Sequence, residues 1–149
     1  MAESLLLVGN AGAAHVGAHL KNAAFSLGVP FHFLNCAGAY EGPAWQVALS
    51  WHLRGRRPLG LGALSRQVEQ VCQEKRPRLL LCVGLAPVDE RALEAAGRAG
   101  ARRLNFLTDD PWNPDHRAPW FLKALPRYDE IFTPRRANIE DLKKNCGQV

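Results

Sequence analysis

Short apolar runs alternate with amphipathic stretches along most of the chain. Residues 4–8 form a nearly continuous apolar run that ends at Gly9, a pattern typical of a strand buried on both faces. After a glycine-containing turn, apolar residues recur at helical spacing from Val16 to Leu27, and Gly28 ends the pattern. The same reasoning predicts further strands at 31–34, 79–83, 104–107 and 130–132, and further helices at 44–53, 61–72, 88–99, 120–125 and 135–145.

This alternation of strands and helices defines the expected fold class. In α/β proteins such an order produces a parallel sheet with helices on both faces. We therefore predict a Rossmann-like three-layer α/β domain with a mostly parallel sheet of five to six strands. The 149 residues fit a single domain, in which residues 35–60 form the least regular part. Gln148 and Val149 resemble the start of another strand, which suggests a fragment or a domain whose partner lies elsewhere.

Charge and cysteine content narrow the classes of partner and compartment. The formal charge is +5, but the basic residues occur mostly as pairs on predicted helix faces and in loops, where we expect solvated surface. No RNA-binding signature is present, so we expect no nucleic acid partner. The four cysteines lie far apart without metal-site spacing. We therefore expect reduced thiols in a cytoplasmic protein, and no run of about 20 apolar residues predicts a membrane span.

The first loop carries candidate ligand contacts at Gly9, Asn10 and Gly12. Its glycines lack the G-x-G-x-x-G spacing of a dinucleotide site, so we expect no nicotinamide cofactor. Glycines here still let the backbone approach a ligand at a helix N-terminus, although tight packing of the turn explains them equally well. His15 follows at the start of the helix, where its imidazole could hold a proton or contact a phosphate or a sugar hydroxyl.

The second candidate site is the segment 105–114, in which a strand runs directly into Asp109, Asp110, Pro111 and Trp112. Ligands of parallel sheets bind beyond the carboxyl ends of the strands. The two acids are therefore candidates for a general base and a hydrogen-bond acceptor, with Trp112 as an apolar wall. Alternatively, Asp110 caps a turn before Pro111 while Asp109 faces solvent. The sequence leaves both interpretations open.

A metal-dependent reaction is a further alternative. His15 and His19 are spaced i, i+4, but no acid accompanies them in an H-E-x-x-H pattern. A hydrolase that uses these two histidines with Asp109 and Asp110 stays possible on residue types alone. Our leading interpretation includes neither a metal nor a cofactor.

The second half of the chain carries three short motifs that match a known family. They are Thr108-Asp-Asp-Pro-Trp112, then Tyr128-Asp-Glu-Ile-Phe-Thr133, then the predicted helix at 135–145 followed by Cys-Gly-Gln-Val. With these motifs, residues 79–149 resemble the N-terminal domain of CgeB-like (spore-maturation type) glycosyltransferases. That family has the GT-B architecture of two facing Rossmann-like domains.

The resemblance implies that this chain is the acceptor-side half of a hexosyltransferase-like enzyme. The other half, a C-terminal domain, binds the nucleotide sugar, so this half is expected to be inactive alone. Asp109 and Asp110 match the family's acidic loop, which faces the interdomain cleft. The resemblance implies that a base from this domain deprotonates a hydroxyl acceptor, which then attacks the anomeric carbon of the nucleotide sugar. Gly9, Gly12 and His15 match only the general position of its first loop.

The alternative is a non-catalytic Rossmann-like module that binds a nucleotide or another anion at the turn from Gly9 to His15. A domain without its partner leaves apolar surface exposed. Such a module is therefore expected to form a homodimer or dock to a partner chain through the face near Trp112 and Trp120.

Overall fold

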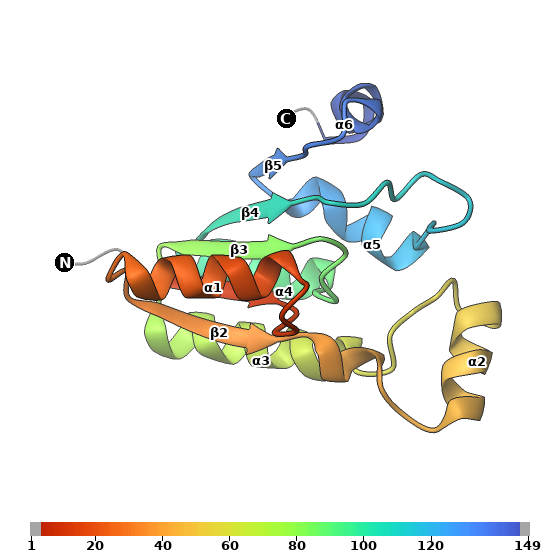
Figure 1. The fold of residues 1–149 in the computed structure, drawn as a ribbon, viewed down its shortest axis with the longest axis horizontal. Helices are drawn as coiled ribbons and strands as arrows, with labels where there is room; N and C mark the ends of the chain where they lie inside the picture. Colours follow the sequence, from red (N-terminus) through yellow and green to blue (C-terminus); the bar gives the residue numbers. More distant parts are fainter. Residues whose placement is uncertain (1–3, 147–149) are drawn as a thin grey trace.

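The computed structural model describes residues 4–146 and contains a five-stranded sheet in which every neighbouring pair is parallel (Figure 1). Its spatial order is β2-β1-β3-β4-β5. This confirms the predicted Rossmann-like α/β class, and the residues expected to begin another strand, 148 and 149, lie outside the described part. The strands are β1 (Leu5–Gly9), β2 (Phe31–Asn35), β3 (Leu79–Val83), β4 (Arg102–Phe106) and β5 (Glu130–Phe132).

Within residues 4–146, six α-helices and two 3-10 turns lie between or after the strands. The helices are α1 (Val16–Ser26), α2 (Ala44–Leu53), α3 (Leu61–Lys75), α4 (Glu90–Arg98), α5 (Pro119–Ala124) and α6 (Ala137–Cys146). The turns are η1 (Ala37–Tyr40), which the sequence pattern did not predict, and η2 (Leu125–Arg127). No helix within residues 4–146 combines the length and the apolar character that crossing a bilayer requires.

The strand order places the helices in two unequal layers. The chain moves from β1 outward to β2 and then returns to β3 on the other side of β1, so α1 lies on one face and α3, α4 and α5 lie on the other (Figure 1). The face covered by α3, α4 and α5 is fully buried at Leu80, Cys82, Asn105 and Ile131. On the α1 face, Leu81 and Leu104 are only partly buried, and Phe132 is 49% exposed. The helical layer over β4 and β5 is therefore incomplete on this side.

Strand β1 is the centre of the core. Its residues Leu6, Leu7 and Val8 are fully buried because helices cover both faces, as the uninterrupted apolar run predicted. Cys72 and Cys82 are also fully buried, in agreement with their expected role as small core residues. Burial raises the pKa of Cys82 to about 12 and that of Cys72 to about 11, so both thiols stay protonated at neutral pH.

Helix α1 buries a different set of residues from the one that its periodicity predicts. The apolar stripe was expected to reach Leu27, but this residue is 77% exposed, and the buried positions are Gly17, Ala18 and Ala24. The cause is steric, since a Cβ at Gly9 would lie 3.0 Å from the Cα of Gly17. The helix approaches β1 so closely that only small side chains fit between them.

Strand β4 begins two residues before the predicted strand. Arg102 and Arg103 lie before the predicted strand at 104–107, but they pair in register with Leu79 and Leu80. Their side chains bind acidic residues at the start of β5: Arg102 forms an ion pair with Glu130, and Arg103 forms one with Asp129. Paired charges are compatible with a strand end, which charge alone does not reveal.

Candidate functional site

A cleft of about 440 Å³ opens at the carboxyl ends of β1, β3 and β4. The strand order reverses between β1 and β3, and ligands of open parallel sheets bind at this topological switch point. Four segments contribute to the walls: residues 10–17, 36–56, 83–86 and 108–120. Their polar and aromatic lining residues are Asn10, His15, Cys36, Tyr40, Trp51, Arg56, Thr108, Asp109, His116 and Trp120.

Side-chain amides shape the first wall. The Oδ1 atom of Asn10 accepts a hydrogen bond from the backbone N–H of Gly12 at 2.8 Å. The Oδ1 atom of Asn35 accepts from the N–H groups of Ala11 and Ala37, both at 3.1 Å, and so joins the loops after β1 and β2. Asn10 lines the cleft. Gly12 does not line it, because this residue forms the turn itself.

The glycines of this wall have a packing role. A Cβ at Gly17 would lie 2.8 Å from the carbonyl oxygen of Asn10, and a Cβ at Gly9 would lie 3.0 Å from the Cα of Gly17. Gly9 is buried and does not line the cleft. Of the two explanations left open for these glycines, the geometry supports close contact between β1 and α1.

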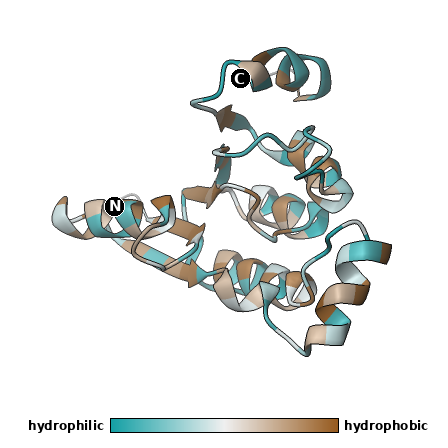
Figure 2. Ribbon diagram, turned by 45° about the vertical axis from the view of Figure 1, so that its right-hand side comes forward, coloured by the Kyte–Doolittle hydropathy of each residue, from teal (hydrophilic) through white to brown (hydrophobic). Residues whose placement is uncertain are grey.

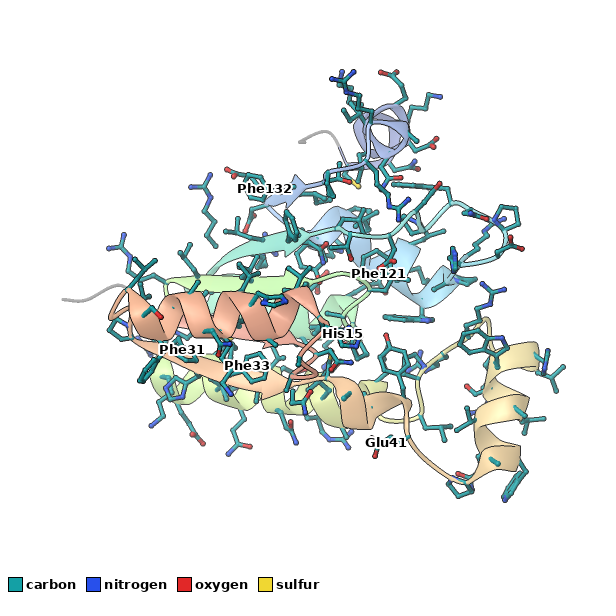
Figure 3. The ribbon with its side chains drawn as sticks, in the orientation of Figure 1. His15, Phe31, Phe33, Glu41, Phe121 and Phe132 are labelled. Carbon is teal, nitrogen blue, oxygen red and sulfur yellow. The ribbon has the colours of Figure 1, made fainter. Side chains whose placement is uncertain are left out.

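His15 is the last residue before α1. Its backbone is extended and its side chain makes no capping hydrogen bond to the helix. Figure 3 shows it at the end of α1 that meets the loops of the cleft. The exposed imidazole is therefore available to a ligand, next to the first N–H groups of the helix, which favour negative charge.

The two neighbouring acids have different surroundings. Asp110 accepts hydrogen bonds at Oδ1 from the backbone N–H groups of Trp112 (3.0 Å) and Asn113 (3.2 Å). This is the turn-capping arrangement that the sequence left open. Asp109 instead lines the cleft, half-buried, and accepts from the Thr108 hydroxyl at Oδ2 over 3.1 Å.

Helix α6 holds the backbone on which Asp109 lies. The Nε atom of Arg135 donates to the carbonyl oxygen of Thr108 at 2.6 Å. The Nδ2 atom of the fully buried Asn138 donates to the carbonyl oxygen of Asp109 at 2.8 Å. Neither residue was a candidate from the sequence. They attach the acidic loop to the start of α6.

The irregular segment after β2 supplies a wall that sequence reasoning missed. The Tyr40 hydroxyl donates to the carbonyl oxygen of Leu85 at 2.8 Å. Burial, with smaller contributions from nearby Cys36 and Asp109, raises the pKa of Tyr40, so the phenol stays a protonated donor. The concentration of aromatic residues and arginines within 40–57 was the available signal.

Two indoles and a guanidinium complete this wall. The Arg56 guanidinium lies 5.1 Å from the centre of the Trp51 ring, within the range of a cation–π contact. One of its nitrogens donates to the carbonyl oxygen of Asp115. The carbonyl oxygen of Arg56 accepts from Trp120 Nε1 at 3.1 Å. These contacts join the segment after β2 to the loop after β4.

The structure therefore brings Asn10, His15 and Asp109 together in one cleft and leaves Asp110 outside it. Trp112, expected as an apolar wall, is partly buried and packs against the hydrophobic core instead. Within residues 4–146, no group of three or more His, Cys, Asp or Glu side chains is placed to hold a metal ion. His15, His19, Asp109 and Asp110 thus do not form a ligand set.

A wider depression of about 780 Å³ lies at the other end of the strands, where β4 and β5 begin. Its walls include Arg103, Asp129 and Glu94. These charges already bind one another or nearby groups, since Arg103 pairs with Asp129 and Arg127 pairs with Glu94. The cleft at the switch point is the better candidate because its polar groups come from several strand ends.

Comparison with known proteins adds no family assignment. No protein-family model matches the chain, and no curated protein sequence matches it. The resemblance to CgeB-like glycosyltransferases therefore depends on the three motifs of the second half, and the fold and cleft stand on the structure itself.

Proposed function

We propose that this chain is the acceptor-side domain of a glycosyltransferase and that the switch-point cleft binds the hydroxyl acceptor. The observation that carries the proposal is the convergence of His15 and Asp109 on one cleft that is also lined by Trp51 and Trp120. A sugar-like ligand presents hydroxyl groups at its edge and apolar C–H groups on its ring faces. Carboxylate, imidazole and indole groups match these two surfaces.

The cleft contains two groups that can accept a proton. In the proposed reaction, the acceptor hydroxyl loses its proton to His15 or Asp109 while its oxygen forms a bond to the anomeric carbon of the donor sugar. The bond from that carbon to the donor phosphate breaks, and the nucleoside diphosphate leaves with the electron pair. The nucleotide sugar is held by a separate domain, so this chain binds the acceptor without turning over the donor.

A second candidate is a non-catalytic module that binds a nucleotide or another anion. It is favoured by the positive groups of the same cleft, which are the N-terminus of α1 and the side chain of Arg56. In this case the ligand contacts centre on residues 9–17, and Asp109 opposes binding instead of supporting it.

NMR titration of the chain with simple glycosides, nucleoside diphosphates and nucleotide sugars separates the two candidates. We expect glycosides to shift the amides of residues 10–17 and 108–120. Asp109→Asn removes the charged acceptor and should weaken glycoside binding by about tenfold, the value of a hydrogen bond to a charged group. Asp110→Asn is the matched control, because asparagine can also cap the turn and the residue does not line the cleft.

Two results would contradict the acceptor-side proposal. Shifts produced by nucleotides alone, strengthened by Asp109→Asn, identify the anion-binding module. Turnover of a nucleotide sugar by this chain alone shows a complete donor site and also contradicts the proposed division between two domains.

A further inference from the structure

Helix α2 exposes three large apolar side chains along one of its faces. Trp45, Leu49 and Leu53 follow the i, i+4, i+8 spacing of one helix face, and they are 67%, 45% and 76% exposed. The buried residue of the helix is Ser50, whose hydroxyl donates to the carbonyl oxygen of Arg57 at 2.6 Å. A surface helix of a globular domain normally buries its apolar face and exposes its polar one. In α2, Val47 is half-buried and Trp51 lines the cleft, but the face with Trp45, Leu49 and Leu53 is left uncovered.

The position of α2 agrees with this exposure. Figure 1 shows the helix standing apart from the sheet and from the other helices, joined to them by the chain on either side. Figure 2 shows hydrophobic segments along α2 at the outside of the molecule. The exposed face of α2 is therefore free to contact a lipid surface or another molecule.

The charge around α2 identifies the chemistry of the partner. Residues 42–68 contain no acid, and Arg54, Arg56 and Arg57 follow directly after the helix. Arg56 is engaged with Trp51 and Asp115, whereas Arg54 and Arg57 are exposed. An apolar surface beside exposed arginines is complementary to a partner that is apolar inside and anionic at its rim.

We propose that α2 docks on the surface of an anionic lipid bilayer through a patch formed by Trp45, Leu49, Leu53, Arg54 and Arg57, here called the α2 patch. Interfacial helices bury their apolar face about 5–10 Å into the boundary between headgroups and acyl chains. Indoles favour this boundary, and arginines near it are attracted to anionic lipids. A ten-residue helix is about 15 Å long, half the hydrocarbon thickness, so it lies in the surface instead of crossing it.

A second copy of the chain is a poorer occupant. A two-fold interface places the same patch on both sides, so it would bring together two surfaces that each carry Arg54 and Arg57 and no acid of their own. Lipid headgroups supply the missing negative charge. The inference is independent of the proposed function, although Trp51 and Arg56 join the α2 segment to the cleft wall.

Vesicle sedimentation with the full chain tests the apolar part of the α2 patch. We expect binding to vesicles of phosphatidylcholine mixed with phosphatidylglycerol, little binding to pure phosphatidylcholine, and a blue shift of tryptophan emission on binding. Leu49→Ser and Leu53→Ser should each weaken binding by about tenfold, because each removes one apolar side chain that the bilayer would bury. Phe25→Ser is the matched control, since Phe25 is 80% exposed on the distant helix α1.

A second pair of variants tests the charge. Arg54→Gln combined with Arg57→Gln should reduce binding to the anionic vesicles by about thirtyfold, as two charges near the surface are lost, and added salt should weaken the binding of the unchanged chain. Arg91→Gln is the control because Arg91 is exposed on α4, outside the α2 patch.

Three results would overturn the inference. They are the absence of binding to either vesicle, an equal loss of binding in Phe25→Ser, and a dimer in analytical ultracentrifugation that Leu49→Ser and Leu53→Ser dissolve. The last result would assign the α2 patch to contact between copies. The substituted side chains are exposed, so unfolding curves should remain unchanged and any loss of binding reports on the surface.

Discussion

At the scale of single residues, glycine determines how the first wall of the cleft is built. The backbone of Gly17 meets the backbone of Asn10, and no side chain can stand between them. The contact holds the start of α1 against the end of β1. This contact therefore also positions the imidazole of His15, two residues earlier, at the mouth of the cleft.

Gly17→Ala should destabilise the protein by about 1–3 kcal/mol. Its new methyl group would lie 2.8 Å from the carbonyl oxygen and 2.9 Å from the nitrogen of Asn10, so the backbone must shift. Gly62→Ala in α3 is the matched control, because the nearest atom to its new Cβ is the end of Arg66 at 3.6 Å. Alanine should stabilise that helix by about 0.5–1 kcal/mol.

Urea unfolding of the two variants measures the difference. Opposite signs are the expected outcome. Equal effects would show that α1 moves away from β1 without cost, and that the close contact does not hold the first wall.

Residue-level chemistry also separates Asp109 from Asp110, which the sequence could not do. Both acids follow a strand and precede a proline, so both fit a site or a turn. The outcome depends on the path of the loop, which brings two backbone N–H groups to Asp110 and the Thr108 hydroxyl to Asp109. That path is held by Arg135 and Asn138, about thirty residues away, and no local pattern contains this information.

At the scale of elements, an ion pair attaches the short strand β5 to β4. Asp129 accepts at Oδ2 from the backbone nitrogen and Nε of Arg103, at 2.7 and 2.9 Å, and at Oδ1 from a terminal guanidinium nitrogen at 2.6 Å. The hydrogen bonds from Arg103 hold the pKa of Asp129 below its ordinary value. The same bonds raise the pKa of Arg103.

Asp129→Asn should lower the free energy of unfolding by about 1 kcal/mol at pH 7, a modest value because the pair is partly exposed to solvent. A carboxylate with a lowered folded-state pKa stabilises the fold fully above its unfolded pKa, near 4. This contribution is lost as the pH falls through the lower folded-state pKa. The difference between variant and unchanged protein should therefore narrow below about pH 4.

Denaturant unfolding at pH 7, 5 and 3 checks this prediction. Asp115→Asn serves as the control, since Asp115 lies in an exposed loop. A difference that stays constant down to pH 3 would mean that Asp129 acts through its shape and not through its charge.

Most elements were predictable because their boundaries are local. The bounds expected for the strands at 79–83 and 130–132 and for the helix at 44–53 are those found. The orientation of α2 was not predictable in the same way. Trp45, Leu49 and Leu53 form the pattern of a buried helix face, and only the distance of α2 from the sheet shows that this face is exposed.

At the scale of the whole molecule, neighbouring strands and helices cover the strands of the sheet unevenly. Strands β1 and β3 each have a hydrogen-bonded neighbour on both sides, whereas β5 has three residues and pairs with β4 alone among the described strands. The helical layer on the α1 side is also incomplete over β4 and β5. The centre and this edge therefore differ in how easily they open.

Amide hydrogen exchange should show this gradient. We expect the amides of β1 and β3 to exchange only through global unfolding and those of β5 to exchange faster by about tenfold or more, through local opening. Protection factors corrected for intrinsic exchange give the comparison. Equal protection in β5 and β1 would mean that something further covers the β5 edge in solution, such as another copy of the chain.

The cleft walls differ in how they are anchored, and this affects how the site can change. The wall that carries Asp109 is held at its backbone by two hydrogen bonds, from Arg135 and Asn138. The wall between β2 and α3 is attached through single side chains and carbonyl groups: the Tyr40 hydroxyl donates to Leu85, Arg56 donates to Asp115, and Trp120 donates to Arg56. It is a connecting segment of the sheet, and such segments tolerate substitution and insertion better than strands do. Ligand choice can therefore be altered at residues 36–57, which connect two elements, without rebuilding the strands of the sheet.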